Sequence, residues 1–162
     1  QFGTSTHTVF STRDAVEQHV LDADLVIGGV LIPGASAPKL VTREMVAAMT
    51  PGSVIVDVAI DQGGCCETSK ATTHADPTYV VDDVVHYCVA NMPGGVPRTS
   101  TYALNNVTLP HILTLADHGF REALKADSHL RNGLNVHDGQ VTNAEVAVDL
   151  GYNYVEPVSV LG

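Results

Sequence analysis

The stretch SVIVDVAIDQGG, Ser53 to Gly64, decides the fold class of this chain. Its first part, SVIVDVAI, is apolar and rich in β-branched residues, which is typical of a buried β-strand. The run ends in the carboxylate of Asp61, an amide and two glycines. A carboxylate at the tip of a strand can cap the turn, orient a ligand or accept a proton. Without a partner base or metal in the sequence, a turn cap is the simplest interpretation.

Further strand patterns occur on both sides of this stretch. ADLVIGGVLIPG, Ala23 to Gly34, is a short apolar run closed by Gly and Pro, and it predicts a strand buried on both faces. Two β-rich stretches follow, Thr78–Val81 and Val84–Ala90. Strands that alternate with helices predict an α/β fold with a parallel sheet, right-handed crossovers and covering helices. Such sheets bind ligands at the carboxyl ends of their strands, where Asp61 is expected.

Helix patterns flank the Ala23–Gly34 strand. STRDAVEQHVLDA has Ser11 or Thr12 as its N-cap, and VTREMVAAMTPGS begins after Thr42 and is stopped by Pro51-Gly52. From about Arg98 the chain becomes mainly helical. Apolar residues recur at helical spacing in TLPHILTLADHGFREALKA, at Leu109, Ile112, Leu113, Ala116, Phe120 and Leu124. Near the C-terminus, TNAEVAVDLG has Thr142 and Glu145 in capping-box spacing and Gly151 as a stop.

The composition limits the class of protein. The chain has 162 residues, of which 44% are hydrophobic and 16% charged, so it is globular. A formal charge of −10 and the lack of a basic cluster argue against nucleic acid as a partner. No apolar run approaches the roughly 20 residues of a membrane span. The chain starts without Met and without a signal peptide, and its three cysteines are an odd count. These features predict a piece of a longer, cytoplasmic protein.

The remaining candidate sites are weak. Cys65 and Cys66, with His74 and Cys88, lack the two-residue spacer that turns two thiolates toward one ion, so we predict no metal site. His118 follows a helical stripe and is interpreted as structural. Three strand ends carry Gly- or Pro-containing turns, which fit either a floor for a flat ligand or simply tight turns. The chain has no G-x-G-x-x-G, so a dinucleotide-binding sheet would have its phosphate turn upstream of Gln1.

Two long segments and the C-terminus resemble bacterial alanine dehydrogenases. The segments are ADLVIGGVLIPGASAPKLVTREMVAAMTPGSVIVDVAIDQGGCCETSKATTH and HYCVANMPGGVPRTSTYALNNVTLP, and the end is EPVSVLG. The motifs DQGG, VANMPG and PRTSTYALNN make the resemblance specific, and it covers essentially the whole chain. It implies an oxidoreductase that deaminates L-alanine to pyruvate and ammonium with NAD, reversibly. The enzyme would be a cytoplasmic hexamer, and this chain its C-terminal part, which alone would be inactive.

The resemblance also implies domains and site residues. Residues 1–97 would be the later part of a Rossmann-like dinucleotide-binding domain, and residues 98–162 a returning segment of the substrate domain. Asp61 matches the catalytic aspartate of the DQGG motif. The implied cofactor-binding residues are Ser11, Val30, Leu31, Val58, Ala59, Ile60, Asp61, Val89, Ala90, Asn91 and Met92. The glycines Gly63 and Gly64 would make room for Asp61.

The family's catalytic lysine and histidine, its phosphate turn and its ribose-binding acid would all precede Gln1. These residues would lie in the N-terminal part of the same enzyme. The resemblance therefore implies that this N-terminal part is a partner of the present chain. Two other functions stay open. One is the NAD-binding subunit of a proton-translocating transhydrogenase, and the other is a non-catalytic module that keeps the fold. The position of DQGG directly after a strand favours the dehydrogenase.

Overall fold

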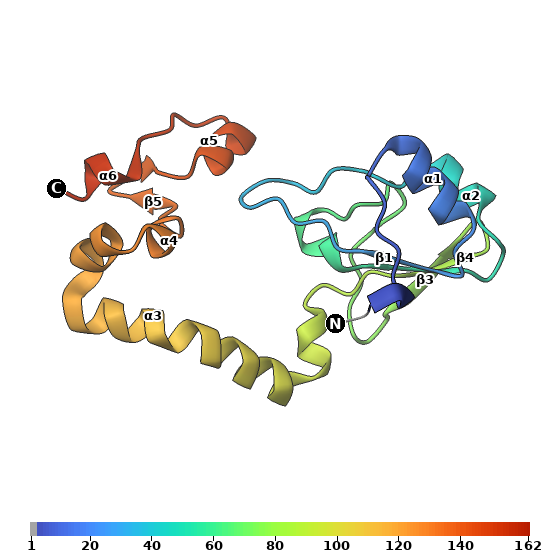
Figure 1. Cartoon of the computed structure of the whole chain (residues 1–162), viewed down its shortest axis with the longest axis horizontal. Helices are drawn as coiled ribbons and strands as arrows, with labels where there is room; N and C mark the ends of the chain where they lie inside the picture. The colour runs from blue at the N-terminus through green and yellow to red at the C-terminus, as the bar shows by residue number, and fades with distance from the viewer. Residues whose placement is uncertain (1–2) are drawn as a thin grey trace. The chain divides into compact units, whose positions relative to one another are not determined.

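The computed structural model describes residues 3–162, which form two compact units (Figure 1). The first unit comprises the described residues up to Leu31 together with Ala37–Met92, and the second comprises Ile32–Ser36 and Pro93–Gly162. The chain therefore enters the second unit briefly at Ile32–Ser36, returns to the first at Ala37, and passes finally to the second between Met92 and Pro93. The assignment of residues 1–97 to a dinucleotide-binding domain and of residues 98–162 to a substrate domain stays a prediction. No helix among the described residues is long and apolar enough to cross a membrane.

The first unit is built on a four-stranded sheet. Its strands are β1 (Leu25–Gly28), β2 (Val54–Asp57), β3 (Thr78–Val81) and β4 (Val84–Tyr87), in the order β1-β2-β4-β3. The first three neighbours, β1, β2 and β4, are parallel, which confirms the predicted α/β class and parallel sheet. Strand β3 instead runs antiparallel to β4. The reason is local: only Asp82 and Asp83 connect the two strands, and both have positive φ, as a tight hairpin turn requires.

Two helices cover one face of this sheet (Figure 1). Helix α1 (Arg13–Leu21) has Thr12 as its N-cap and α2 (Arg43–Ala48) has Thr42, and each Thr hydroxyl accepts a backbone N–H of the first turn. The Thr42 cap is thus confirmed, and of the two predicted caps of α1 the structure selects Thr12. The described residues also form the short 3₁₀ helices η1 (Gly3–Ser5), η2 (Val58–Gln62) and η3 (Met92–Gly95).

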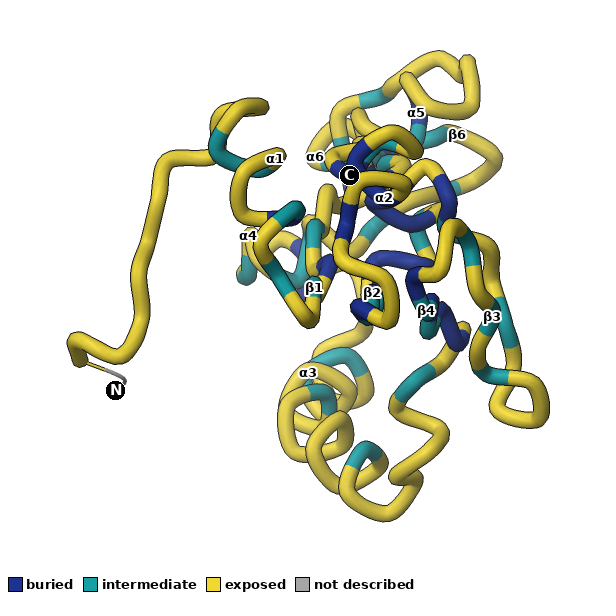
Figure 2. The backbone as a smooth tube through the Cα atoms, turned by 90° about the vertical axis from the view of Figure 1, so that its right-hand side faces the viewer, coloured by how far each residue is buried: buried dark blue, intermediate teal, exposed yellow. Residues whose placement is uncertain are grey.

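The core of the first unit lies between these helices and the sheet. Val46 from α2, Ile55 from β2 and Val84 from β4 are fully buried in it, and the buried backbone in Figure 2 follows β2 and β4. Within the described part of the first unit nothing covers the opposite face of the sheet: Leu25 and Ile27 are 52% and 65% exposed. The prediction that this strand is buried on both faces is therefore wrong for this chain, because α1 and α2 both lie on the same side.

This uncovered face leads to a prediction about the isolated chain. The exposed side of the sheet is lined by Leu25, Ile27, Val54, Val56, Val80, Val85 and Tyr87, and a contiguous apolar surface of this kind promotes association. We expect residues 1–162, expressed alone, to form oligomers or to aggregate. Sedimentation velocity over a range of concentrations measures this, and a single monomeric species at all concentrations would contradict the expectation.

The second unit is mainly helical. Its elements are α3 (Pro97–Ala126), α4 (Ser128–Arg131), β5 (Val136–His137), β6 (Gln140–Val141), α5 (Ala144–Leu150) and α6 (Pro157–Val160). The helical region predicted from Arg98 is confirmed, but Gly119 (φ 74°, ψ 156°) breaks α3 directly after His118. Most of the predicted apolar stripe is exposed in this chain: Ile112 is 54% exposed, and only Leu124 near the C-terminal end of α3 is buried.

The predicted capping box of α5 is displaced by one residue. The N-cap is Asn143, whose side chain accepts the Val146 amide, while the buried Thr142 hydroxyl donates to the carbonyl of Leu134. Asn143 can take the cap position because Asn is as good an N-cap as Thr, and Thr142 has a buried partner instead. The stop at Gly151 is confirmed, since this residue has a left-handed conformation with φ 71°.

Candidate functional site

The carboxyl ends of β1, β2 and β4 meet along one edge of the sheet, because these strands are parallel. The segments that directly follow them are Gly29–Leu31, Val58–Gln62 and Cys88–Met92. All the cofactor-binding residues predicted from the sequence, apart from Ser11, lie in these three segments. The structure therefore brings them to one edge, the position at which open parallel sheets bind ligands.

Asp57, the last residue of β2, organises the segment that follows it. Its side chain is fully buried, and its two oxygens accept four hydrogen bonds from N–H and O–H groups and a longer one from the Cys65 thiol at 3.5 Å. The N–H and O–H donors are the amides of Ala59 (3.1 Å), Cys65 (2.8 Å) and Cys66 (3.2 Å) and the hydroxyl of Ser69 (2.5 Å). The backbone after β2 is thus wrapped around a buried carboxylate, which satisfies amides that would otherwise lack a partner.

Two glycines allow this close packing. Gly64 has a φ of +76°, and a Cβ on it would lie 2.7 Å from both Asp57 Oδ2 and Ser69 Cβ. A Cβ on Gly28, at the end of β1, would overlap the Cys65 sulfur. The expectation that Gly63 and Gly64 make room for Asp61 is therefore replaced: Gly64 makes room for Asp57 and Ser69, and Gly63 supplies a left-handed turn with φ +89°.

Asp61 lies in η2, not at the tip of the strand as predicted, because β2 already ends at Asp57. Its side chain is exposed, and within residues 3–162 it makes no hydrogen bond or ion pair. The turn-cap role that the sequence suggested for Asp61 belongs to Asp57. A carboxylate on an ordered turn that does no structural work is available to a ligand.

The neighbours of Asp61 in η2 divide between the core and the surface. Ala59 and Ile60 are 6% and 7% exposed and pack inward, so only their backbone is open to a ligand. Val58 is 50% exposed. In the segment after β1, Val30 packs against the core while Leu31 is 74% exposed. Val58 and Leu31 therefore give this edge of the sheet an apolar surface.

The segment after β4 is held in place by residues that precede β3. The amide of Ala90 donates to the carbonyl of Thr72, and His74 Nε2 donates to the carbonyl of Asn91 at 2.9 Å. Val89 is fully buried, Met92 is half-buried, and Ala90 and Asn91 are exposed. Asn91 has a φ of 59°, and its exposed side chain stands on a fixed turn. His74 thus helps to hold this turn.

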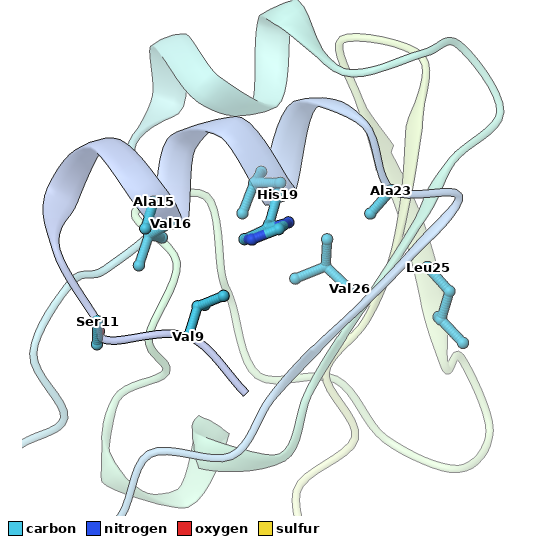
Figure 3. A pocket seen from close by; sticks show the side chains of 9 residues that line it. Val9, Ser11, Ala15, Val16, His19, Ala23, Leu25 and Val26 are labelled. Carbon is cyan, nitrogen blue, oxygen red and sulfur yellow. The ribbon is translucent and has the colours of Figure 1, made fainter. Parts of the chain in front are cut away.

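Ser11 lies in the segment that leads into α1, beside β1. It lines a cleft of about 420 Å³ between that segment, α1 and β1, together with Val9, Val16, His19 and Val26 (Figure 3). Ser11 also lines a second cleft with Lys39 and Thr42. Strand β1 is at the end of the sheet in the described part of the chain, so the first cleft adjoins an unpaired strand edge.

The three cysteines are buried and unbridged. Asp57, Cys65 and Cys66 have ligand atoms within 4.8 Å of one another, but the carboxylate oxygens already accept the hydrogen bonds described above. Contact between the two neighbouring thiols raises the pKa of Cys66, which burial raises further, and lowers the pKa of Cys65. These cysteines are best described as packing residues.

Sequence reasoning missed the structural roles of Asp57, Lys39 and His86. The signal for Asp57 was its position as a single charged residue inside an apolar strand, where a carboxylate is buried only if it is bonded. Nothing in the sequence singled out Lys39 or His86.

His86 is fully buried; its Nδ1 donates to the Val84 carbonyl (3.0 Å), and its Nε2 accepts the Thr68 hydroxyl (2.7 Å). The Val84 carbonyl places the ring proton on Nδ1, and burial disfavours the charged form of the ring.

His86 predicts a loss of stability at low pH. Burial lowers its pKa, so the unfolded chain takes up a proton near pH 6.5 while the folded protein does not. The unfolded state then binds more protons, and stability falls as the pH drops below about 6.5. We expect the thermal midpoint to fall between about pH 7.5 and pH 5.5 more steeply for the wild type than for His86→Gln. Equal slopes for the two proteins would contradict this role of His86.

Three comparisons with known proteins agree with one another. The family model described as "Alanine dehydrogenase/PNT, C-terminal domain" matches residues 1–144. The alanine dehydrogenase of Halomonas elongata is 64% identical over 155 residues, which are 96% of this chain and 42% of that protein. The chain therefore spans about two-fifths of the length of this relative.

Two solved structures resemble the fold of this chain. An L-alanine dehydrogenase matches with a TM-score of 0.76 and 49% identity, over 93% of this chain and 41% of the other. The transhydrogenase of Sinorhizobium meliloti matches with a TM-score of 0.58 and 33% identity, over 83% of this chain and 36% of the other. The dehydrogenase is thus the more similar of the two in both sequence and fold.

Proposed function

The chain belongs to the family of the alanine dehydrogenase/PNT C-terminal domain, and we propose that it is the C-terminal part of an NAD-dependent alanine dehydrogenase. The whole protein would convert L-alanine to pyruvate and ammonium, reversibly, as a cytoplasmic hexamer. The observation that carries this proposal is the exposed carboxylate of Asp61, which has no bonding partner among residues 3–162 and stands on an ordered turn at the carboxyl edge of the sheet. The identity to a named alanine dehydrogenase, 64% over nearly the whole chain, supports it.

The edge of the sheet fits a nicotinamide cofactor. Leu31, Val58 and Ala90 are exposed at the ends of three neighbouring strands and offer an apolar floor for a flat ring. A Cβ on Gly29 would meet nothing within 4 Å, so the backbone there faces open space. Val30, Ala59, Ile60, Val89 and Met92 support this floor, and Ser11 lines the cleft beside it. When bound, NAD would accept a hydride from the Cα of alanine.

Asp61 would act on the amine end of the substrate. Loss of hydride from Cα leaves a cationic imine, which a nearby carboxylate stabilises and which water then converts to pyruvate and ammonium. The same carboxylate can orient the attacking water. The exposed Asn91 side chain can hydrogen-bond a carboxamide from its fixed turn. In this account the chain supplies one face of the site and one charged group.

The other face would come from the N-terminal part of the same protein. Among the described residues no strand pairs with the outer edge of β1, and the apolar cleft beside it is lined by Val9, Val16 and Val26. A further parallel strand would complete both the sheet and the dinucleotide site, since a pyrophosphate is normally held by a glycine-rich turn at a helix start. We propose that this chain binds NAD and turns over alanine only together with that part.

Two other functions compete with this proposal. The match to a transhydrogenase favours a subunit that binds NAD without amino-acid chemistry, although its identity of 33% is lower than the 49% of the dehydrogenase structure. A non-catalytic module is the other. Neither function needs an exposed carboxylate on a turn held as rigidly as that of Asp61.

The test uses the whole protein that contains this chain. We expect NADH to form when L-alanine and NAD are supplied together, and NADH to be consumed with pyruvate and ammonium. Hydride exchange between NAD(H) and NADP(H) without alanine would support the transhydrogenase instead. NAD binding with no reaction in either assay would support the non-catalytic module.

A further inference from the structure

The segment Ala37–Val41 binds every backbone carbonyl from Gln62 to Cys66, the stretch that directly follows Asp61. The amide of Ala37 donates to the Gln62 carbonyl at 2.8 Å. The amides of Leu40 and Val41 both donate to the Cys65 carbonyl, at 2.8 and 3.2 Å. The remaining three carbonyls, of Gly63, Gly64 and Cys66, are bound by the side chain of Lys39.

The Lys39 ammonium lies at the meeting point of these three carbonyls. Its Nζ is 2.6 Å from the Gly63 oxygen, 2.8 Å from the Gly64 oxygen and 3.3 Å from the Cys66 oxygen. A lysine has three N–H donors, so the number of donors equals the number of acceptors. Gly63 and Gly64 both have positive φ, and the tight turn that they form directs its oxygens toward one cation.

The same stretch is bound on its amide side by Asp57, which accepts the amides of Cys65 and Cys66. A buried anion thus binds the N–H groups of the turn and a lysine binds its C=O groups. We use the name Asp61 turn for residues 58–66. The Asp61 turn is fixed from both sides, while the Asp61 side chain remains outside both sets of contacts.

We propose that Lys39 is the positioning residue of Asp61: by binding the carbonyls of the Asp61 turn it holds the Asp61 carboxylate at the place where the substrate amine reacts. This inference rests on the proposed dehydrogenase function. Lys39 does not itself touch the substrate in this account. A displacement of a reacting group by about 1 Å can cost up to a hundredfold in rate, so the position of the turn matters.

Lys39→Met should separate positioning from mere stability. Methionine keeps an unbranched side chain of similar length but has no donors, so the carbonyls of Gly63 and Gly64 lose the Lys39 hydrogen bond and that of Cys66 keeps only the Ser69 amide. In the whole protein we expect kcat with L-alanine to fall about tenfold, while the dissociation constant of NADH changes less than about twofold. Lys70→Met is the matched control, because Lys70 is exposed and its ammonium lies over the Tyr79 ring, 4.8 Å from its centre, without binding the turn.

A chemical rescue tests whether the ammonium is the group that matters. Lys39→Cys, alkylated with 2-bromoethylamine, regains an ammonium at nearly the original length, whereas alkylation with iodoacetamide gives a neutral side chain. The native Cys65, Cys66 and Cys88 are buried, and mass spectrometry verifies single modification. We expect the aminoethylated protein to recover most of the lost kcat and the neutral adduct to recover none. Equal activities of the two adducts would overturn the proposal.

Hydrogen exchange provides a readout that does not depend on the reaction. The amides of Gly63, Gly64, Cys65 and Cys66 are all hydrogen-bonded in the native turn, so their exchange reports its order. Lys39→Met should exchange faster here than the wild type and Lys70→Met. Unchanged exchange, or faster exchange with unchanged kcat, would overturn the positioning role. A wild-type protein that does not oxidise alanine would instead refute the proposed function, whatever the exchange shows.

Discussion

Asp61→Asn, made in the whole protein, is expected to lower turnover of L-alanine by about a hundredfold or more while NADH binding changes little. The substitution keeps the size of the side chain but removes the negative charge that would stabilise the cationic imine. Because Asp61 is exposed and makes no hydrogen bond within residues 3–162, its loss should not disturb the fold. Steady-state kinetics and cofactor titration of the same variant measure the two effects separately.

The matched control is Asp24→Asn. Asp24 is also exposed, but it precedes β1 and so lies at the opposite edge of the sheet. We expect this variant to keep nearly full turnover and an unchanged thermal midpoint. Near-normal turnover of Asp61→Asn would remove Asp61 from the chemistry, since its structural role as a turn cap already belongs to Asp57.

Asp57→Ala should have the largest effect on stability. It would leave three amides, one hydroxyl and the Cys65 thiol around a buried void, and an unsatisfied buried donor costs about 1–3 kcal/mol. We expect a loss of at least about 3 kcal/mol, which is enough to bring many proteins to the insoluble fraction. The soluble yield and the thermal midpoint of the whole protein measure the loss.

Asp57→Asn separates the effect of the carboxylate's charge and second acceptor oxygen from the effect of its size. An amide of the same size can accept on one oxygen only and turns its NH₂ group toward donors, so we expect an intermediate loss of stability. Asp24→Ala serves as the exposed control and should melt like the wild type. A soluble Asp57→Ala protein with an unchanged midpoint would show that the Asp61 turn does not depend on this carboxylate.

The parallel sheet could be predicted because its information is local. Runs such as SVIVDVAI and LVIG mark strands, and Thr12 and Thr42 begin helices by capping interactions within a few residues. The break at Gly119 and the cap at Asn143 were missed for a related reason: Gly within a helical pattern and adjacent Thr and Asn residues each allow two local solutions, and tertiary contacts choose between them.

The site was harder to predict because it depends on contacts between distant residues. The sequence marks Asp61 and its glycines, but Asp57 accepts donors 2 to 12 residues away along the chain, and Lys39 binds carbonyls 24 to 27 residues away. Backbone carbonyls carry no signature in the amino-acid sequence, so the partner of a lysine that binds them is visible only in the structure. The sequence could therefore locate the turn but not what holds it.

The transfer of deuterium from L-alanine labelled at Cα tests the central claim most directly. The whole protein is incubated with labelled alanine and NAD, and the reduced cofactor is analysed by mass spectrometry. If the carboxyl edge of this sheet holds nicotinamide over the substrate Cα, the label appears on the reduced cofactor, and Asp61→Asn forms this product far more slowly. Unlabelled reduced cofactor, or none at all from an intact and folded wild-type protein, would contradict the account.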